Sequence, residues 1–255
     1  MPDAAAFFDL DRTLISGSSV YTFGRIAWKN RLLSTTELLD DAWKAVAFRF
    51  RGSTDEGASN VRDRILGAIE GVPVEMLENL GDEIIPRLLD NVRDEAQGFL
   101  DLHAEAGRDT YMVTASPIEI VARLAAELGM TGAIATVAEI EDGRYTGRLA
   151  EPFCYGPGKA TAIARLAEQK GYDLERCYAY SDSASDLPMM EIVGHPVAVN
   201  PDRTLERTAR ERGWPVVEFS RTAKRAIRIT SAGVGSAGLA IATYFLGRYH
   251  QRSKA

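Results

Sequence analysis

The chain has 255 residues, 45% of them hydrophobic and 26% charged, which is the balance of a globular protein rather than a disordered or fibrous one. Its net charge of −6 argues against a general nucleic-acid binder, whose affinity rests on many cationic contacts to phosphates. The two cysteines, Cys154 and Cys177, argue against a disulfide framework. No secretory signal precedes Asp9, so we expect a cytoplasmic protein.

The predicted elements begin with a short apolar run, residues 4–9, which indicates a buried strand that ends at an acidic cluster. Between Ser18 and Asn91 the apolar residues recur at helical spacing, and strand patterns are absent. This stretch predicts a helical insertion of roughly seventy residues, the size of a small domain.

Strands and helices are expected to alternate after Asn91. The predicted strands cover residues 110–114, 133–138, 177–181, 196–199 and 216–219, and the predicted helices cover residues 117–128, 159–169, 186–193 and 205–212. A hairpin is expected over residues 140–147, with Asp142-Gly143 as its turn. This alternation predicts an α/β fold with a doubly wound parallel sheet covered on both faces. We expect a core of residues 1–16 and 92–220, a helical cap of residues 17–91 and a helical tail of residues 221–255.

Two acidic residues, Asp9 and Asp11, end the first predicted strand in the sequence Asp-Leu-Asp-Arg-Thr. Residues i and i+2 of an extended backbone project to the same side, so both carboxylates should face the crevice where open α/β sheets bind ligands. Like charges this close repel each other, which suggests a cation between or beside them. From these residues alone, a solvated acidic turn is the alternative.

Thr114 and Lys159 carry groups that can bind an anion in the same crevice. Thr114 ends a predicted strand; a helix N-cap is its ordinary interpretation, although Ser116 suits that role better. Lys159 begins a predicted helix after Gly156-Pro157-Gly158, where a cation opposes the helix dipole unless an anion lies nearby. A plain surface lysine remains the alternative.

A second carboxylate pair, Asp182 and Asp186, follows the strand predicted over residues 177–181. Asp186 lies four positions after Asp182 in the first turn of a predicted helix, and this spacing brings both side chains to one face. Capping of that helix by acidic residues is the ordinary alternative.

In chain order these features are a carboxylate pair, a hydroxyl, a lysine and a second carboxylate pair, each at the end of a predicted strand or after one. This order resembles the haloacid dehalogenase superfamily, specifically subfamily IB, the branch similar to phosphoserine phosphatase. The resemblance extends to about Phe219 and includes the insertion, which is similar to that branch's cap. It implies a phosphatase that acts on a small phosphorylated metabolite.

The resemblance also implies the chemistry. Asp9 is the nucleophile that becomes a phosphoaspartate, and Asp11 is the general acid and base. Mg²⁺ is held by Asp9, by the backbone carbonyl of Asp11 and by Asp182. Thr114 and Lys159 bind the phosphoryl oxygens.

Two residues are expected to support this site. Asp186 positions a metal-bound water or the lysine. Asn200 lies in a tract that resembles the family, and an ordinary turn is an equally good interpretation of it.

Three positions near the cap bear on the substrate. Ser18 stands where phosphoserine phosphatases carry a glutamate that reads the substrate amine, and Arg12 replaces a smaller residue. Arg64 matches a cap arginine that meets the substrate carboxylate, with an exposed helix arginine as the alternative. The missing acid at Ser18 points to a phosphomonoester other than phosphoserine, such as that of a sugar, a polyol or a lipid headgroup.

Two other classes place similar residues on a doubly wound sheet. A phosphotransferase or phosphomutase shares the phosphoaspartate but returns phosphate to a sugar. A phosphorylatable receiver has no helical insertion, and its phosphorylated aspartate ends a different strand from the acidic pair.

The tail contains an uncharged stretch, residues 229–247, with cations on both sides. As a helix, which rises about 1.5 Å per residue, this stretch is long enough to span a bilayer core of about 30 Å. Its many small residues, however, make the free energy of transfer into a membrane weak. Two interpretations stay open, peripheral membrane contact and docking against protein. In either case we expect the tail to be dispensable for catalysis.

Overall fold

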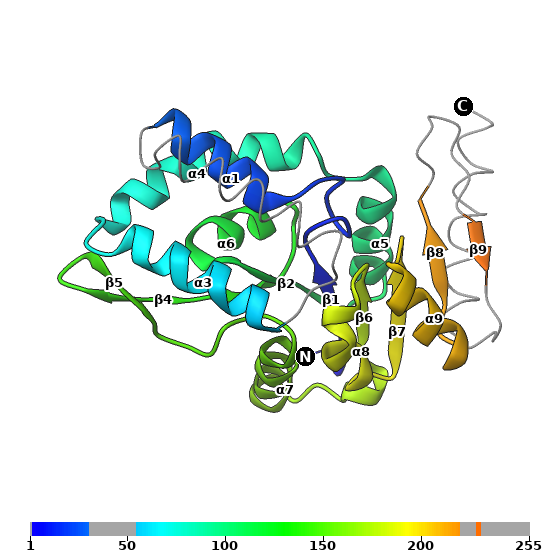
Figure 1. Cartoon of the computed structure of the whole chain (residues 1–255). Helices are drawn as coiled ribbons and strands as arrows, with labels where there is room; N and C mark the ends of the chain where they lie inside the picture. The colour runs from blue at the N-terminus through cyan, green and yellow to red at the C-terminus, as the bar shows by residue number, and fades with distance from the viewer. Residues whose placement is uncertain (1, 31–54, 220–227, 231–255) are drawn as a thin grey trace.

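The computed structural model describes residues 2–30, 55–219 and 228–230, and within these ranges seven strands form one sheet in the order β3-β2-β1-β6-β7-β8-β9 (Figure 1). The strands are β1 (Ala5–Asp9), β2 (Asp109–Pro117), β3 (Gly132–Thr136), β6 (Tyr178–Ser181), β7 (His195–Val199), β8 (Val216–Glu218) and β9 (Arg228–Thr230). Neighbouring strands run parallel except for β8 and β9, which are antiparallel. The predicted doubly wound parallel sheet is confirmed.

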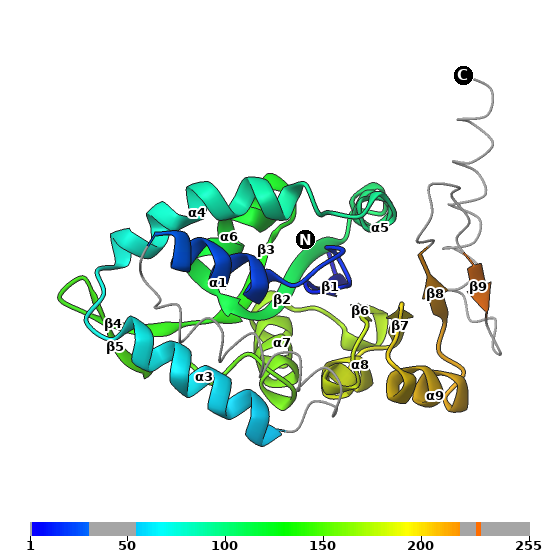
Figure 2. The same ribbon diagram turned by 45° about the horizontal axis from the view of Figure 1, so that its top comes forward.

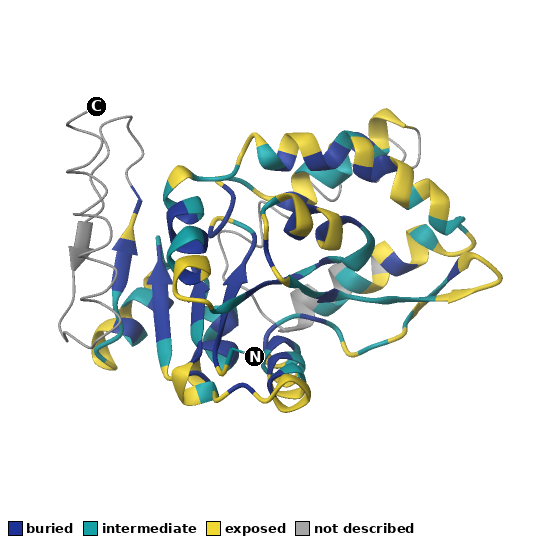
Figure 3. Cartoon of the chain, turned by 180° about the vertical axis from the view of Figure 1, so that it is seen from behind, coloured by how far each residue is buried: buried dark blue, intermediate teal, exposed yellow. Residues whose placement is uncertain are grey.

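Helices cover both faces of this sheet. Alternate residues of β1 point to opposite faces, and the residues on both faces are buried. Phe8 belongs to a core cluster with α4 (Val74–Leu89), α5 (Asp94–Glu105) and α6 (Ile118–Glu127). Phe7 belongs to the cluster on the other face, with α7 (Pro157–Lys170), α8 (Leu187–Glu191) and α9 (Arg203–Glu211). The strands are largely buried, and exposed residues lie on the outer sides of the helices (Figure 3).

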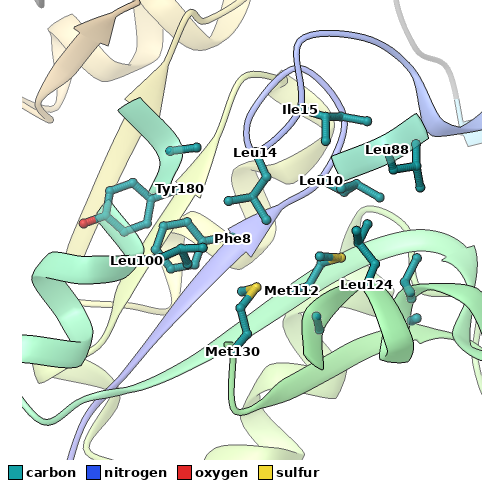
Figure 4. Close-up of a cluster of buried hydrophobic side chains, with 14 of the residues drawn as sticks. Phe8, Leu10, Leu14, Ile15, Leu88, Leu100, Met112, Leu124, Met130 and Tyr180 are labelled. Atoms are coloured by element: carbon teal, nitrogen blue, oxygen red, sulfur yellow. The ribbon is translucent and has the colours of Figure 1, made fainter. Parts of the chain in front are cut away.

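The core beside β1 is formed by residues that are far apart in the sequence (Figure 4). The ring of Phe8 stacks on the ring of Tyr180 from β6, with centroids 4.5 Å apart. Leu88 of α4 and Leu124 of α6 pack in the same cluster. Removing a buried phenylalanine ring from such a cluster costs about 3–5 kcal/mol, so this packing holds the carboxyl end of β1 in place.

The described part of the insertion after β1 is helical, as predicted, and contains α1 (Ser19–Lys29), α3 (Asp55–Ile69) and α4; residues 31–54 lie outside the described residues. A two-stranded hairpin, β4 (Ala138–Glu141) and β5 (Arg144–Leu149), extends away from the main sheet and lies beside α3 (Figure 2). The Tyr145 amide donates to the Val72 carbonyl at 3.0 Å, and the Gly71 amide donates to the Tyr145 carbonyl at 2.8 Å. The hairpin therefore joins the insertion through backbone hydrogen bonds.

The turn of this hairpin is the one the sequence predicted. Asp142 has a φ of 50° and Gly143 a φ of 74°, the left-handed pair that a tight two-residue hairpin turn requires.

Three local predictions were wrong. β2 continues beyond Thr114 to Pro117, with an irregular register opposite β3 after Val113, and the N-cap of α6 is Pro117 instead of Ser116. Asp186 ends a short 3₁₀ turn (Ala184–Asp186) before α8 instead of lying in a first α-helical turn. Arg228–Thr230, predicted as helical tail, forms a strand because the free edge of β8 offers unpaired backbone groups to it.

Most of the uncharged tail stretch, residues 231–247, lies outside the described residues. Across residues 2–30, 55–219 and 228–230, no helix has the length and apolarity needed to cross a bilayer. The dispensability of the tail for catalysis remains a prediction.

Candidate active site

The candidate site lies at the carboxyl ends of β1, β2 and β6, the central strands of the sheet. Asp9 is the last residue of β1 and pairs in register with Val113 of β2, so Thr114 lies level with the turn that follows Asp9. Asp182 directly follows β6, the other neighbour of β1. The three strands thus bring these residues to the edge where ligands of open α/β sheets bind.

A buried lysine links two of the predicted carboxylates. The Lys159 ammonium donates to Oδ1 of Asp9 at 2.6 Å and to Oδ2 of Asp186 at 2.9 Å. The same oxygen of Asp186 accepts the Ser181 hydroxyl at 2.7 Å. Lys159 is 3% exposed, which rules out the surface-lysine interpretation.

Lys159 reaches the site because α7 begins with an unusually close backbone turn. Gly156, the N-cap, has a φ of 52°, a conformation that residues with side chains rarely adopt. A Cβ at Gly158 would lie 1.9 Å from the Phe153 carbonyl oxygen, so only glycine allows this approach. The two glycines therefore place the first turn of α7, and with it Lys159, beneath the end of β1.

Asp182 is held from two directions. Its carboxylate forms an ion pair with Arg12, with Oδ2 2.7 Å from Nε, and its backbone carbonyl accepts the Asp202 amide at 2.8 Å. Asp202 in turn accepts the Ala184 amide at 2.9 Å while capping α9. Asp202 therefore anchors the loop that carries Asp182, a role the sequence analysis did not assign.

Asp11 faces the first residue of α1. Both the amide and the hydroxyl of Ser19 donate to its carboxylate, the hydroxyl at 3.0 Å. The Ser19 hydroxyl also lies 2.9 Å from the Ser116 hydroxyl, and the Ser116 amide donates to Oγ1 of Thr114 at 3.2 Å. Thr114 is buried, so its hydroxyl lies within the protein rather than at its surface.

Burial sets the electrostatics of the cluster. Loss of solvation, with smaller contributions from neighbouring carboxylates, raises the pKa of Asp9 and of Asp182, although Lys159 and Arg12 oppose the rise. Burial likewise raises the pKa of Asp11, against the two Ser19 hydrogen bonds. Burial alone would lower the pKa of Lys159. The negative charges of Asp186 and Asp9 outweigh that effect and raise the pKa, so the lysine is protonated.

The site has the charge and the free oxygens that suit a divalent cation. When ionised, four carboxylates face two cations, Lys159 and Arg12, which leaves a surplus of two negative charges. Among the described residues, nothing donates a hydrogen bond to Oδ2 of Asp9 or Oδ1 of Asp182. Hard carboxylate oxygens of this kind are the ligands that Mg²⁺ prefers.

The expected ligand set is small. Within the described ranges, no three His, Cys, Asp or Glu side chains lie close enough together to hold a metal ion by themselves. The set expected from the sequence has only two side-chain ligands, Asp9 and Asp182, and one backbone carbonyl, that of Asp11. Waters and the substrate phosphate would complete it.

The structure thus brings together Asp9, Lys159 and Asp186 by direct contact, with Asp11, Thr114 and Asp182 around them. Arg64 is on α3, and its side chain lies outside the described residues. Asn200, considered as a supporting residue, directly follows β7, and its Oδ1 accepts the amide of Phe219, the residue after β8, at 2.7 Å.

Ser19, Ser181 and Asp202 were missed by sequence reasoning. Asp202 could have been noticed as a helix cap, since it follows Asn200-Pro201 and precedes an amphipathic segment. The sequence around Ser19 and Ser181 offers no comparable indication.

Comparison with known proteins agrees with this geometry. Residues 6–191 match the family of haloacid dehalogenase-like hydrolases. A curated protein of Mycobacterium tuberculosis (strain ATCC 25618 / H37Rv), phosphoserine phosphatase SerB1, is 42% identical over 246 residues, covering 94% of this chain and 79% of its own. A histidinol-phosphatase of Neisseria meningitidis serogroup C (strain 8013) is 29% identical, covering 84% of this chain and 98% of its own.

A solved structure shares the fold. A protein of unknown function from Bordetella pertussis Tohama I superposes with a TM-score of 0.74 at 28% identity, covering 85% of this chain and 98% of that one. The expectation of a phosphatase with this fold is confirmed by these matches. Because the family match covers most of the chain and includes Asp9, Lys159 and Asp182, the chain belongs to the haloacid dehalogenase-like hydrolases.

Proposed function

We propose that the chain is a Mg²⁺-dependent phosphomonoester hydrolase that works through a phosphoaspartyl intermediate on Asp9. The observation that carries the proposal is the buried contact between Asp9 and the Lys159 ammonium, 2.6 Å apart, with Asp182 beside it. A carboxylate held against a cation at the end of a central strand is suited to attack an anionic phosphoryl group that the same cation helps to bind.

The chemistry divides between Asp9 and Asp11. An oxygen of Asp9 forms a bond to phosphorus while the bond from phosphorus to the ester oxygen breaks, and Asp11 gives the leaving oxygen a proton. Asp11 then takes a proton from water, whose oxygen attacks phosphorus. The bond from phosphorus to Asp9 breaks, which releases inorganic phosphate, restores the Asp9 carboxylate and leaves Asp11 protonated as at the start.

The remaining residues bind charge. Lys159 and the Thr114 hydroxyl hold phosphoryl oxygens, and Asp186 keeps the ammonium of Lys159 in position through their 2.9 Å contact. Asp9, Asp182 and the Asp11 carbonyl would hold Mg²⁺. When bound, the ion supplies positive charge that stabilises the transferring phosphoryl group.

The proposed substrate is a small phosphorylated metabolite. The relatives are named for phosphoserine and for histidinol phosphate, two small alkyl phosphates that carry an amine. Ser18, the position of the expected amine reader, is exposed at the N-cap of α1. We therefore place phosphoserine below other phosphomonoesters as the preferred substrate.

Two alternatives carry different products. A phosphotransferase or phosphomutase would use the same phosphoaspartate but pass the phosphoryl group to a second hydroxyl instead of to water. The receiver alternative is dropped, because the family match is to hydrolases and both acidic residues lie at the end of the same strand, Asp9 as its last residue and Asp11 two positions later.

The protein's location and contacts also remain proposals. We place it in the cytoplasm and expect no nucleic-acid partner. Membrane contact through residues 229–247 is tested by comparing the fractionation of the full chain with that of a variant truncated at Ser220.

The deciding experiment is a screen of phosphomonoesters for phosphate release, with Mg²⁺ and with EDTA, on wild type and on Asp9→Asn. We expect release that needs Mg²⁺ and is abolished in Asp9→Asn, since an amide is a poor nucleophile and a poor metal ligand. Asp142→Asn, an exposed hairpin-turn change, is the matched control. If Asp9→Asn keeps more than about a tenth of wild-type kcat, a barrier change under about 1.4 kcal/mol, the nucleophile assignment is wrong. Interconversion of phosphosugars without net phosphate release would favour the mutase.

A further inference from the structure

The carboxylate of Asp11 accepts two hydrogen bonds from Ser19. Among the described residues, every hydrogen bond donated to this carboxylate comes from Ser19, whose amide reaches Oδ1 and whose hydroxyl reaches Oδ2 at 3.0 Å. Ser19 is completely buried, at 0% exposure, so water does not compete for either bond. Two donors on one carboxylate fix the direction in which its oxygens point.

Ser19 is also the first residue of the insertion's first helix. It begins α1, and the exposed N-cap, Ser18, makes no side-chain capping bond. The Ser19 amide is one of the helix donors that lack an intrahelical partner, and Asp11 supplies the missing acceptor. The positive end of the α1 dipole therefore faces the Asp11 carboxylate.

A third contact connects Ser19 to the phosphate side of the site. Its hydroxyl lies 2.9 Å from the Ser116 hydroxyl, and the Ser116 amide donates to Thr114 at 3.2 Å. These contacts join the insertion, the acid and the end of β2. A shift of α1 would therefore move the carboxylate of Asp11 relative to Thr114.

We propose that Ser19 is the positioning residue for Asp11, holding its carboxylate in the orientation from which it transfers the proton and linking that orientation to the placement of the insertion. This inference rests on the proposed function, in which Asp11 protonates the leaving oxygen. In this mechanism Ser19 binds neither substrate nor metal, and it affects proton transfer through Asp11.

Two variants remove the contacts in steps. Ser19→Ala removes the hydroxyl and keeps the amide. Ser19→Pro removes both donors and still suits a first helical position, and the preceding Ser18 already has the extended backbone, φ −114° and ψ 126°, that a following proline requires. Thr22→Ala is the matched control, because the Thr22 hydroxyl lies in the same turn of α1 and, within the described part of the chain, donates only to the Ser18 carbonyl, at 3.4 Å.

The readout is the dependence on the leaving group. For each variant, kcat and KM are measured with 4-nitrophenyl phosphate, whose leaving group departs without a proton, and with the alkyl phosphate that wild type hydrolyses fastest among phosphoserine, histidinol phosphate and glycerol phosphate. General acid catalysis contributes about 10²–10⁴-fold, so partial misplacement of the acid should lower the alkyl kcat/KM by about 10–100-fold in Ser19→Pro, and by less in Ser19→Ala. The aryl kcat/KM should change by less than about threefold, and alkyl KM should stay near wild type.

Three outcomes would overturn the inference. Equal losses on both substrates would show a general structural role for Ser19, and unchanged alkyl hydrolysis in both variants would show that Asp11 does not need it. A loss in Thr22→Ala as large as that in Ser19→Ala would assign the effect to α1 as a whole.

If Ser19→Pro does not fold, as judged by circular dichroism and Tm, Ser19→Ala alone decides. Asp9→Asn, assayed in parallel, separates this inference from the proposed function, since retained activity there would remove the phosphoaspartate itself.

Discussion

Lys159 and Asp186 form the buried ion pair that orders the candidate site, with Nζ 2.9 Å from Oδ2 and side chains 4% and 2% exposed. The Asp186 carboxylate allows the Lys159 ammonium to be buried at the end of β1, where burying an unpaired ammonium would cost much free energy. The Ser181 hydroxyl donates to the same oxygen of Asp186 at 2.7 Å and holds the acceptor in place. In the proposed mechanism, Asp9 therefore depends on Asp186, a residue that does not itself touch phosphorus.

Changing Asp186 to Asn should lower kcat by about 10–100-fold, the usual cost of losing a partner that orients a site residue. The amide cannot balance the charge of Lys159, which will then shift its position relative to Asp9. Phosphate release under saturating Mg²⁺ is the measurement, with Asp142→Asn as the control for an Asp-to-Asn change elsewhere. Full activity in Asp186→Asn would show that Asp9 alone positions the lysine.

Mg²⁺ should bind more tightly as the pH rises from 6 to 8.5. Burial, together with Asp9, raises the pKa of Asp182, so binding the ion must displace a proton that the metal-free site retains at lower pH. We expect the apparent Kd to fall by up to about tenfold per pH unit, measured by titration calorimetry. A Kd that does not change over this range would contradict the prediction.

The same shift predicts a gain in stability from Asp182→Asn. An acid whose folded pKa is raised stabilises the fold below its unfolded pKa, and this contribution is lost as pH rises through the folded pKa. At pH 8 the metal-free variant should therefore have a higher Tm than wild type, while the increase in Tm caused by Mg²⁺ disappears. A lower Tm would mean that the contact of Asp182 with Arg12 outweighs the cost of burying the charge.

Phosphoserine should be a poor substrate, because Ser18 presents no carboxylate to its amine. We expect at least one other member of the phosphomonoester panel to exceed its kcat/KM. Ser18→Glu should raise kcat/KM for phosphoserine and leave that for 4-nitrophenyl phosphate unchanged. If phosphoserine exceeds every other substrate by a factor of about a hundred, a gap of about 2.7 kcal/mol, the argument from Ser18 fails.

Replacing Gly158 with Ala should destabilise the fold and lower activity together. The new Cβ would lie 1.9 Å from the Phe153 carbonyl oxygen, so the start of α7 must move and take Lys159 with it. We expect a loss of about 1–3 kcal/mol in urea unfolding and a fall in kcat. Gly67→Ala is the control: a Cβ there meets no other atom within 4 Å, and it should stabilise α3 by about 0.5–1 kcal/mol.

Stability should fall in acid because His103 is buried as a neutral ring. Its Nδ1 accepts the Arg108 Nε at 2.8 Å, and its Nε2 lies 2.8 Å from the Tyr180 hydroxyl. Burial, with the nearby Arg108, lowers the pKa of His103 to about 3. A lowered pKa means that stability is present above the unfolded value near 6.5 and is lost as the pH falls toward the folded value.

The comparison that isolates this effect is wild type against His103→Gln, which does not titrate. Between pH 7.5 and pH 5, wild type should lose about 2 kcal/mol more of its unfolding free energy than the variant. Equal losses would show that other groups account for the whole acid sensitivity.

Residues whose position depends on local backbone patterns were predictable. Asp9 ends a strand whose other residues are all apolar, Asp11 follows two positions later, and Asp142-Gly143 is a pair typical of tight hairpin turns. Less local features were predicted wrongly. Arg228–Thr230 forms a strand only because the edge of β8 lies beside it, and no pattern within these three residues indicates that.

The sequence by itself determined the order of strands and helices and the chemical types of the site residues, because periodicity and turn residues act over a few positions of the chain. Only the tertiary structure decided the contacts between distant residues. Lys159 meets Asp9 across 150 positions, and Ser19 meets Ser116 across 97. Such contacts depend on how helices pack on the two faces of the sheet, and the sequence near Ser19 or Lys159 does not specify that packing.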